Sequence, residues 1–120
     1  MIPKKNSTNY IHEKHVKGVI SELRAIQILL DLGFLVFHNV APNGIIDLIA
    51  ISPDNETFRI DVKTRSKRKT KSKKRQIGHE IYRSPSKAQK AMDVVLMIVD
   101  SDSWKIHPTR SKLSKWLGTK

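Results

Sequence analysis

The sequence predicts a mixed α/β domain in which a central β-sheet is flanked by helices. Three observations predict this class: a helical period of apolar residues near the N-terminus, two β-branched runs separated by a turn signal, and an apolar six-residue run nearer the C-terminus. In chain order the expected elements are α-β-β-β-α-β-β-α. At 120 residues the chain can build one modest core, so we expect a single domain over residues 1–120.

The first expected element is a helix over residues 15–32. Its apolar residues recur at steps of three and four: Val16, Val19, Ile20, Leu23, Ile26, Leu29 and Leu30. Gly33 is expected to end this helix as its C-cap. Residues 1–12 have little apolar content, and we expect them to be a flexible N-terminus. Glu22 has small neighbours one turn away, which favours a place at the rim of the core, although a solvated acid is the usual alternative.

Three strands follow this helix. Residues 34–40 form the first, and residues 41–44, with Pro and Asn-Gly, form a loop. Residues 45–51 and 57–63 are expected to pair as a β-hairpin, because the Pro/Asp/Asn break at residues 52–55 is a turn signal.

The second half of the chain predicts one more helix, two strands and a closing helix. A helix is expected over residues 84–91, with Ser84 as its N-cap. Residues 94–99 are purely apolar and predict a central buried strand. Residues 104–107 predict an edge strand, and residues 111–117 a short closing helix.

The composition points to a polyanionic partner. The chain has 23 Lys+Arg against 11 Asp+Glu, a formal net charge of +12, which favours nucleic acid first and an anionic membrane surface second. Without cysteine there are no disulfides and no thiolate metal sites. No apolar run approaches the ~20 residues of a membrane span, and the polar start is not a secretory signal. We therefore expect a cytoplasmic, DNA-associated protein with no membrane contact.

A strongly basic segment over residues 65–75 lies inside the domain. Its like charges repel and it has no apolar residue to bury, so we expect residues 64–80 to be a mobile loop. A flexible cationic loop can lie along phosphates and release counterions. A nuclear-localisation or solubilising segment is the plainer alternative. The expected phosphate contacts are Arg65, Lys67, Arg68, Lys69, Lys71, Lys73, Lys74 and Arg75, with Asn43 and Lys17 outside the segment.

The hairpin carries the candidate chemistry. In an extended chain Asp61 and Lys63 share one face of the sheet while Val62 points into the core. If the two strands pair in register, Asp47 lies close to Asp61. Two carboxylates and one ammonium would then meet at one edge of the sheet, which suits a divalent metal ion and a phosphodiester.

These residue types suggest distinct roles. Asp47 and Asp61 would bind Mg²⁺ (or Mn²⁺) directly, with the Val62 carbonyl as a third ligand, because Mg²⁺ prefers oxygen ligands and keeps several waters. Lys63 would orient or deprotonate the attacking water, or stabilise developing charge. A lysine near carboxylates stays protonated more readily, which favours the electrostatic role. Glu22 would complete the metal shell, directly or through water.

Four segments together resemble a known family, the PD-(D/E)XK nuclease superfamily, and within it the archaeal Holliday-junction resolvases. The segments are Lys17-Gly18-Val19-Ile20-Ser21-Glu22, Leu32-Gly33-Phe34, Pro42-Asn43-Gly44-Ile45-Ile46-Asp47-Leu48-Ile49-Ala50 and Ile60-Asp61-Val62-Lys63-Thr64. They lie within residues 17–65, about two fifths of the chain. Ile46 stands where the superfamily carries proline, and Asp61 where glutamate is more frequent.

The resemblance implies a restriction-endonuclease-like core and a Mg²⁺-dependent endodeoxyribonuclease that acts on branched DNA in recombination as a homodimer. It also implies that Glu22, Asp47 and Asp61 bind metal and that Lys63 is the catalytic lysine. The same core serves sequence-specific restriction and homing endonucleases, which stay open as alternatives.

A further alternative is a non-catalytic basic nucleic-acid-binding domain in which the acids are structural. A membrane-surface protein ranks third, because no predicted helix pairs a wide apolar face with a basic one. The histidines show no metal-ligand spacing, and we expect surface or loop positions for all five: His12, His15, His38, His79 and His107. Of these, His79 could contact substrate together with Glu80, although a solvated loop is the simpler expectation.

Overall fold

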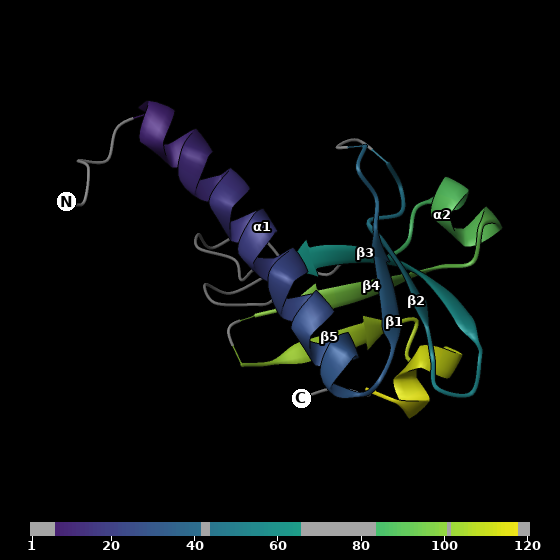
Figure 1. The fold of residues 1–120 in the computed structure, drawn as a ribbon. Helices are drawn as coiled ribbons and strands as arrows, with labels where there is room; N and C mark the ends of the chain where they lie inside the picture. Colours follow the sequence, from purple (N-terminus) through teal and green to yellow (C-terminus); the bar gives the residue numbers. More distant parts are fainter. Residues whose placement is uncertain (1–6, 42–43, 66–83, 101, 118–120) are drawn as a thin grey trace.

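The computed structural model describes residues 7–41, 44–65, 84–100 and 102–117. They form a mixed α/β domain around one five-stranded sheet with strand order β1-β2-β3-β4-β5 (Figure 1). This architecture and the order of its elements confirm the sequence prediction, with a 3-10 helix as the closing element. The elements are α1 (Ser7–Asp31), β1 (Leu35–His38), β2 (Leu48–Ile51), β3 (Thr57–Thr64), α2 (Lys87–Ala91), β4 (Val94–Val99), β5 (Trp104–His107) and the 3-10 helix η1 (Lys112–Lys115).

Helix α1 crosses one face of the sheet, and its N-terminal half extends past the sheet (Figure 1). It begins at Ser7, so residues 7–12 are helical and correct the expectation of a flexible segment there. It ends as predicted at Gly33, which has a positive φ of 87° and donates its N–H to the Leu30 carbonyl at 2.9 Å. The left-handed backbone at this position is the conformation that glycine adopts without a Cβ penalty.

Only one side of α1 is buried against the sheet. Ala25, Ile28 and Leu29 belong to the core, and Ile26 packs partly against it. Most of the apolar residues that gave the helical period are exposed instead: Val16, Val19, Ile20, Leu23 and Leu30. The period thus correctly predicted a helix, but most of the residues that define it do not face the core.

The predicted hairpin is present. Strands β2 and β3 pair antiparallel, with Leu48 opposite Ile60 and Ile51 opposite Thr57. The Ser52 hydroxyl accepts the Glu56 N–H at 3.0 Å across the turn, and Asn55 adopts a positive φ of 71°. Asn tolerates this left-handed conformation better than most residues, which explains why the turn signal was reliable.

Strand β3 pairs with β4 in parallel, and β5 pairs with β4 in the antiparallel direction. All six residues of β4 are buried, which confirms the prediction of a buried strand over residues 94–99. On the α1 side the core is closed by Phe34, whose ring lies 6.1 Å from that of Phe58 and 5.2 Å, edge to face, from that of Trp116. Strand β5 is an edge strand as expected.

Helix α2 begins later than expected. Its N-cap is Ser86 rather than Ser84: the Ser86 hydroxyl accepts the Gln89 N–H at 3.2 Å, and the Gln89 side chain accepts the Ser86 N–H at 3.0 Å. This reciprocal capping box satisfies two N–H groups that a helix start would otherwise leave unpaired. Within the described residues, no helix is both long and apolar enough to cross a membrane.

Candidate active site

Two aspartates face each other where β2 and β3 separate. Leu48 pairs with Ile60, and the Asp47 N–H still donates to the Ile60 carbonyl at 2.8 Å. The next opposed pair is therefore Asp47 and Asp61, and the two carboxyl groups lie close enough for each to affect the other's charge. The structure thus brings together the two carboxylates that the register argument had placed side by side.

The Asp47 side chain also accepts a backbone hydrogen bond that the β2–β3 ladder would otherwise make. Its Oδ2 accepts the Val62 N–H at 2.8 Å, so a side chain takes the donor that the neighbouring strand no longer pairs. Asn39 binds the two residues that precede β2. Its N–H donates to the Asp47 carbonyl and its Nδ2 to the Ile46 carbonyl, each at 2.8 Å. A Cβ on Gly44 would come within 2.5 Å of that Nδ2, so any other residue there would displace this amide. The position of Asp47 is therefore fixed by backbone as well as side-chain bonds.

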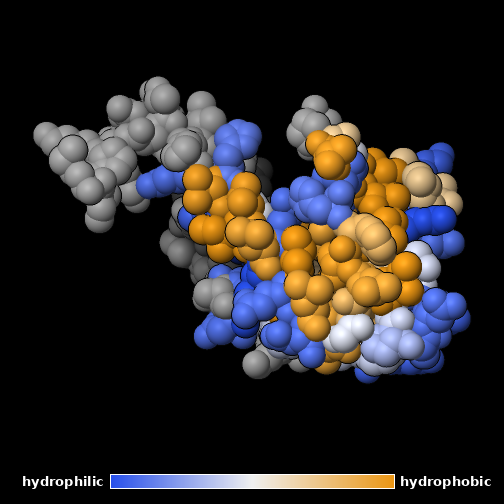
Figure 2. Space-filling view, viewed as in Figure 1, coloured by the Kyte–Doolittle hydropathy of each residue, from blue (hydrophilic) through white to orange (hydrophobic). Residues whose placement is uncertain are grey.

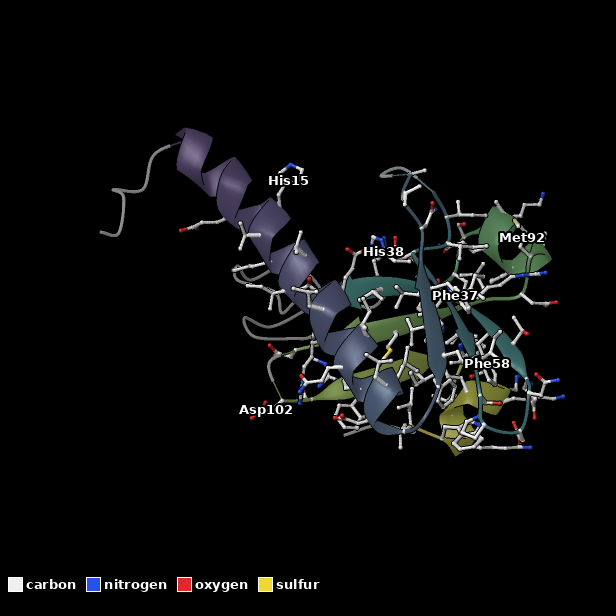
Figure 3. All side chains as sticks on the ribbon, viewed as in Figure 1. His15, Phe37, His38, Phe58, Met92 and Asp102 are labelled. Atoms are coloured by element: carbon white, nitrogen blue, oxygen red, sulfur yellow. The ribbon has the colours of Figure 1, made fainter. Side chains whose placement is uncertain are left out.

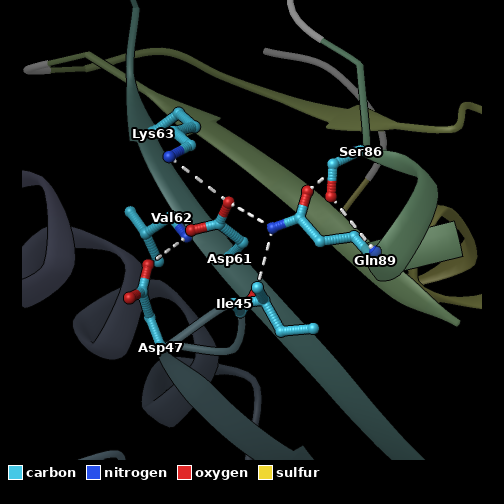
Figure 4. Close-up of polar contacts among 7 residues, drawn as sticks. All are labelled: Ile45, Asp47, Asp61, Val62, Lys63, Ser86 and Gln89. Atoms are coloured by element: carbon cyan, nitrogen blue, oxygen red, sulfur yellow. Dashed lines mark hydrogen bonds and ion pairs between the residues drawn. The ribbon is translucent and has the colours of Figure 1, made fainter. Parts of the chain in front are cut away.

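Asp61 is almost fully buried, with 5% of its surface exposed. Its Oδ2 accepts a hydrogen bond from Gln89 Nε2 at 2.7 Å and lies 3.4 Å from Lys63 Nζ (Figure 4). Lys63 follows Asp61 by two residues on β3, so the two side chains share a face, as the alternation of the strand predicted. A buried carboxylate with two such donors is held in one orientation.

Gln89 is a site residue that the sequence analysis missed. Its Nε2 donates both to Asp61 and to the Ile45 carbonyl, the latter at 3.0 Å, while its Oε1 accepts the Ser86 N–H (Figure 4). The amide thereby joins the start of α2 to β3 and to the chain just before Asp47. One local signal was present, because Ser86 and Gln89 have the spacing of a capping box, but that spacing does not reveal the long-range contact.

Glu22 and His38 form the other wall of the site. The His38 Nε2 lies 3.6 Å from the Glu22 Oε2, and Figure 3 shows His38 between α1 and the rest of the sheet. Ser21, next to Glu22, hydrogen-bonds the hydroxyl of Thr64 at 2.8 Å, which ties α1 to the end of β3. His38 is solvent-exposed as expected, but it also lines the site, which its sequence context did not indicate.

These groups line one open cleft of about 890 Å³. It includes the three acids, Lys63 and His38. It is also bordered by Val62 of β3 and by residues of α1 and of the β1–β2 connection: His15, Gly18, Val19, Asn39, Val40, Ala41 and Gly44. The cleft is therefore large enough to admit a segment of nucleic-acid backbone rather than a single ion.

The surroundings of Asp47 in the cleft disfavour its charged form. The pKa of Asp47 is raised from 3.8 to about 6, mainly because burial disfavours its charged form. The neighbouring Asp61 carboxyl and the negative charge of Glu22 raise the pKa further, while the Val62 N–H opposes the shift. A cation placed between these carboxylates would relieve the repulsion.

The donors present fit a hard divalent cation that keeps part of its water shell. No three acidic or histidine side chains in the described part of the chain are close enough to hold one ion together. Mg²⁺, however, commonly binds through one or two carboxylates and retains several waters. Asp47 and Asp61 supply such a pair, and Glu22 stands across the same cleft, where a water could connect it.

The remaining predicted DNA contacts are only partly described. Lys17 is exposed on α1 but does not border the cleft. Arg65 extends toward the β4–β5 connection, where its guanidinium donates to the Ser103 hydroxyl at 3.2 Å. Asn43, His79, Glu80 and the basic residues 67–75 lie outside the described residues.

Comparison with known proteins identifies a similar fold. The chain matches no family model and no curated protein sequence. Among solved structures it is similar to that of a bacterial homing endonuclease, I-Ssp6803I, with a TM-score of 0.52 and 19% sequence identity. The match covers 88% of this chain and 74% of that one. At this identity the likeness establishes the fold, a mixed α/β architecture like that of an endonuclease, and leaves the activity to be argued from the site.

Proposed function

We propose that this protein is a divalent-metal-dependent DNA endonuclease that hydrolyses phosphodiester bonds. The observation that carries the proposal is the meeting of Asp47, Asp61 and Lys63 at the point where β2 and β3 separate. The similarity to the fold of a homing endonuclease and the net charge of +12 support it.

Asp47 and Asp61 would hold Mg²⁺ or Mn²⁺, with the Val62 carbonyl and Glu22 completing the site. When bound, such an ion neutralises phosphate charge and makes a water molecule more acidic. Asp61 is held in place by the Gln89 amide and the Lys63 ammonium. Asp47 is held through the Val62 N–H, so that both carboxylates are ordered before a substrate arrives.

Lys63 would act on the phosphate itself. Its side chain is 43% exposed although its ammonium is 3.4 Å from the buried Asp61, so it can contact a ligand in the cleft without leaving its partner. An ammonium at this place stabilises the negative charge that develops on the phosphate oxygens during attack.

Two substrate classes follow from two different observations. The segments from residue 17 to residue 65 resemble those of Holliday-junction resolvases, which favours branched DNA as the substrate. The similar solved structure is that of a homing endonuclease, which favours a linear duplex cut at a defined sequence. We propose the structure-selective activity first and the sequence-specific activity as the alternative. In both, the basic residues 65–75 with Lys17 and Asn43 would hold the phosphate backbone.

Cleavage of labelled four-way junction, linear duplex and single strand by the purified protein tests the proposal, with Mg²⁺, with Mn²⁺ and with EDTA. Paired symmetric nicks in the junction alone, lost in EDTA, are the expected result. Metal-dependent cutting of the linear duplex at one sequence would support the homing-type alternative. Binding of all three DNAs without cleavage under any metal would contradict the nuclease assignment and favour a non-catalytic nucleic-acid-binding domain.

A further inference from the structure

Val40 is the most exposed large apolar side chain in the described part of the chain. It is 96% exposed, whereas the other exposed side chains of this kind lie between 37% and 62%. It stands on the β1–β2 connection between Asn39 and Ala41, and Ala41 is also exposed. Figure 2 shows apolar side chains on the described part of this connection, which extends past the sheet in Figure 1. Val40 is not part of the core, so packing of the fold does not explain an apolar residue here.

The backbone on both sides of Val40 is held in place. The Asn39 N–H donates to the Asp47 carbonyl at 2.8 Å, and the Asn39 Oδ1 accepts the Ala41 N–H, also at 2.8 Å. The second bond closes a turn around Val40, and the first attaches that turn to the residue that precedes β2. The valine is therefore held out into solvent in one backbone geometry, and a contact with a ligand would cost little further ordering of the chain.

Val40 borders the cleft, and so does Val19 of α1, which is 54% exposed. The chain has 23 Lys and Arg residues, yet Lys63 is the only one among the described residues that line the cleft. Phosphates beyond the one at Lys63 would therefore meet no lysine or arginine on the described walls. Apolar walls match the uncharged parts of a nucleic acid, which are the faces of the bases and the sugars.

Val40 is also close to the place where the phosphate would be cut. Paired residues of neighbouring antiparallel strands have Cα atoms about 5.5 Å apart, and consecutive Cα atoms are about 3.8 Å apart. Because Asn39 is bonded to Asp47, the Cα atoms of Val40 and Asp47 lie within about 10 Å of each other. A base-pair step rises about 3.4 Å, so Val40 can reach a base within about three steps of the scissile phosphate.

We propose that Val40 is a wedge that packs against a base unstacked from its neighbour close to the scissile phosphate. This inference rests on the proposed nuclease function and adds a residue that selects the substrate. In a stacked duplex each base face is covered by the next base, so an apolar side chain contacts it only where the stack is interrupted. Valine has no side-chain donor or acceptor, so it selects DNA that unstacks easily and does not read the identity of a base.

This role favours particular sites in DNA. A strand-exchange point or a mispaired base already interrupts stacking, which lowers the cost of inserting the side chain. In a linear duplex the same side chain favours pyrimidine–purine steps, because these are the most easily unstacked. The wedge therefore applies to both substrate classes of the proposed function, branched DNA and linear duplex.

The base analogue 2-aminopurine, whose fluorescence rises when it leaves the stack, tests the wedge. It is placed in turn at each position around the exchange point of a four-way junction and around pyrimidine–purine steps of a linear duplex. The whole chain is added in EDTA, at concentrations that shift all of the DNA in a gel. We expect the fluorescence to rise at one position or at a few neighbouring positions. Val40→Ser should lose most of this rise, and Val40→Leu should keep it.

Val16→Ser is the matched control, because it makes the same change at an exposed valine of α1 that does not line the cleft. It should keep the full rise in fluorescence. The Val40 side chain buries almost no surface, so its replacement should leave the protein as stable as the wild type, and unfolding would not explain a lost signal. An equal rise with Val40→Ser and with the wild type, or no rise at any position, would overturn the inference.

Cleavage kinetics give a second readout. On a fully paired substrate that the wild type cuts, Val40→Ser should lower kcat/KM about tenfold, the factor that corresponds to burying one valine side chain. The loss should be smaller on the same DNA with a mismatch at the position that the fluorescence identified. Equal losses on the paired and the mismatched DNA would overturn the wedge. A rise in fluorescence without cleavage under any metal would overturn the proposed nuclease function and support the wedge as a DNA contact.

Discussion

The side chain of Gln89 on α2 donates a hydrogen bond of 2.7 Å to Asp61 on β3, 28 residues earlier in the chain. Through this bond the helix that follows the basic segment is attached to the most buried acid of the site. The same amide holds the Ile45 carbonyl at 3.0 Å, two residues before Asp47. One neutral side chain therefore positions the two chain segments that carry the candidate ligands.

Removing this amide should slow cleavage more than it weakens DNA binding. Gln89→Ala leaves Asp61 with Lys63 but without the donor that fixes its Oδ2, and loss of such a partner typically lowers activity or metal affinity about 10–100-fold. Ser86→Ala is the control, because it weakens the helix cap while keeping the amide beside Asp61. Steady-state cleavage and DNA affinity should separate the two variants. Equal activity of Gln89→Ala and the wild type would exclude the positioning role.

Asp61→Ala should abolish cleavage and keep, or tighten, binding to DNA. The substitution removes a proposed metal ligand and one negative charge near the phosphate. Asp102→Ala removes the same charge from an exposed site labelled in Figure 3, away from the cleft, and should cleave normally. Gel-shift and cleavage assays on the same preparation provide both readouts. Full cleavage by Asp61→Ala would show that the metal site has been assigned to the wrong residues.

The free energy of unfolding should respond to pH through Asp47. Because the folded-state pKa is about 6 and the usual value is 3.8, the folded chain binds this proton more tightly than the unfolded chain. The resulting stabilisation is present below pH 3.8 and is lost as the pH rises through about 6. Asp47→Asn should therefore stabilise the metal-free protein at pH 7, by about 1 kcal/mol after allowing for solvent screening.

Urea denaturation in EDTA at several pH values measures this effect. The stability gain of Asp47→Asn over the wild type should shrink toward zero as the pH falls to about 4. Glu13→Gln, on the part of α1 beyond the cleft, provides a charge-matched control. If Asp47→Asn raised the free energy of unfolding equally at every pH, the raised pKa of Asp47 would not be the cause of that gain.

Neutralising the basic segment should weaken DNA binding and flatten its salt dependence. Changing Lys67, Lys69, Lys71, Lys73 and Lys74 to Gln removes five positive charges. Each phosphate that the variant no longer neutralises should reduce the slope of log affinity against log salt by about 0.9. The double variant Lys112→Gln/Lys115→Gln on η1 is the control, because it tests whether a lower net charge alone weakens DNA binding. An unchanged slope in the five-residue variant would indicate that the segment does not bind phosphates.

Local sequence patterns predicted the hairpin and the placement of its acids, because turn formation and strand alternation depend on residues close together in the chain. The turn at residues 52–55 sets the register, and the register together with the two-residue period of a strand determines that Asp47 meets Asp61 and that Lys63 shares a face with it. The apolar run at residues 94–99 predicted a buried strand for a similar reason, since six consecutive apolar residues are stable only where both faces are covered.

Contacts between distant elements were not predictable in this way. Gln89 reaches Asp61 only because β4 pairs in parallel with β3, which returns the chain to the same sheet edge through α2. His38 joins Glu22 only once α1 has packed over β1. The period of α1 was recognised but not its orientation, because the helix has apolar residues on two sides and only the packed structure shows that Ala25 and Leu29 face the sheet.

The bond between Asp47 and the Val62 N–H has a practical consequence for the choice of an inactive variant. Asp47→Ala would leave that buried N–H without its acceptor, and an unsatisfied buried donor costs about 1–3 kcal/mol of stability. Among the described residues Asp61 accepts no hydrogen bond from a backbone N–H, and Asp61→Asn keeps the shape of the buried side chain. Crystals of the protein with intact DNA should therefore be sought with Asp61→Asn, because this variant leaves the bond between Asp47 and the Val62 N–H in place.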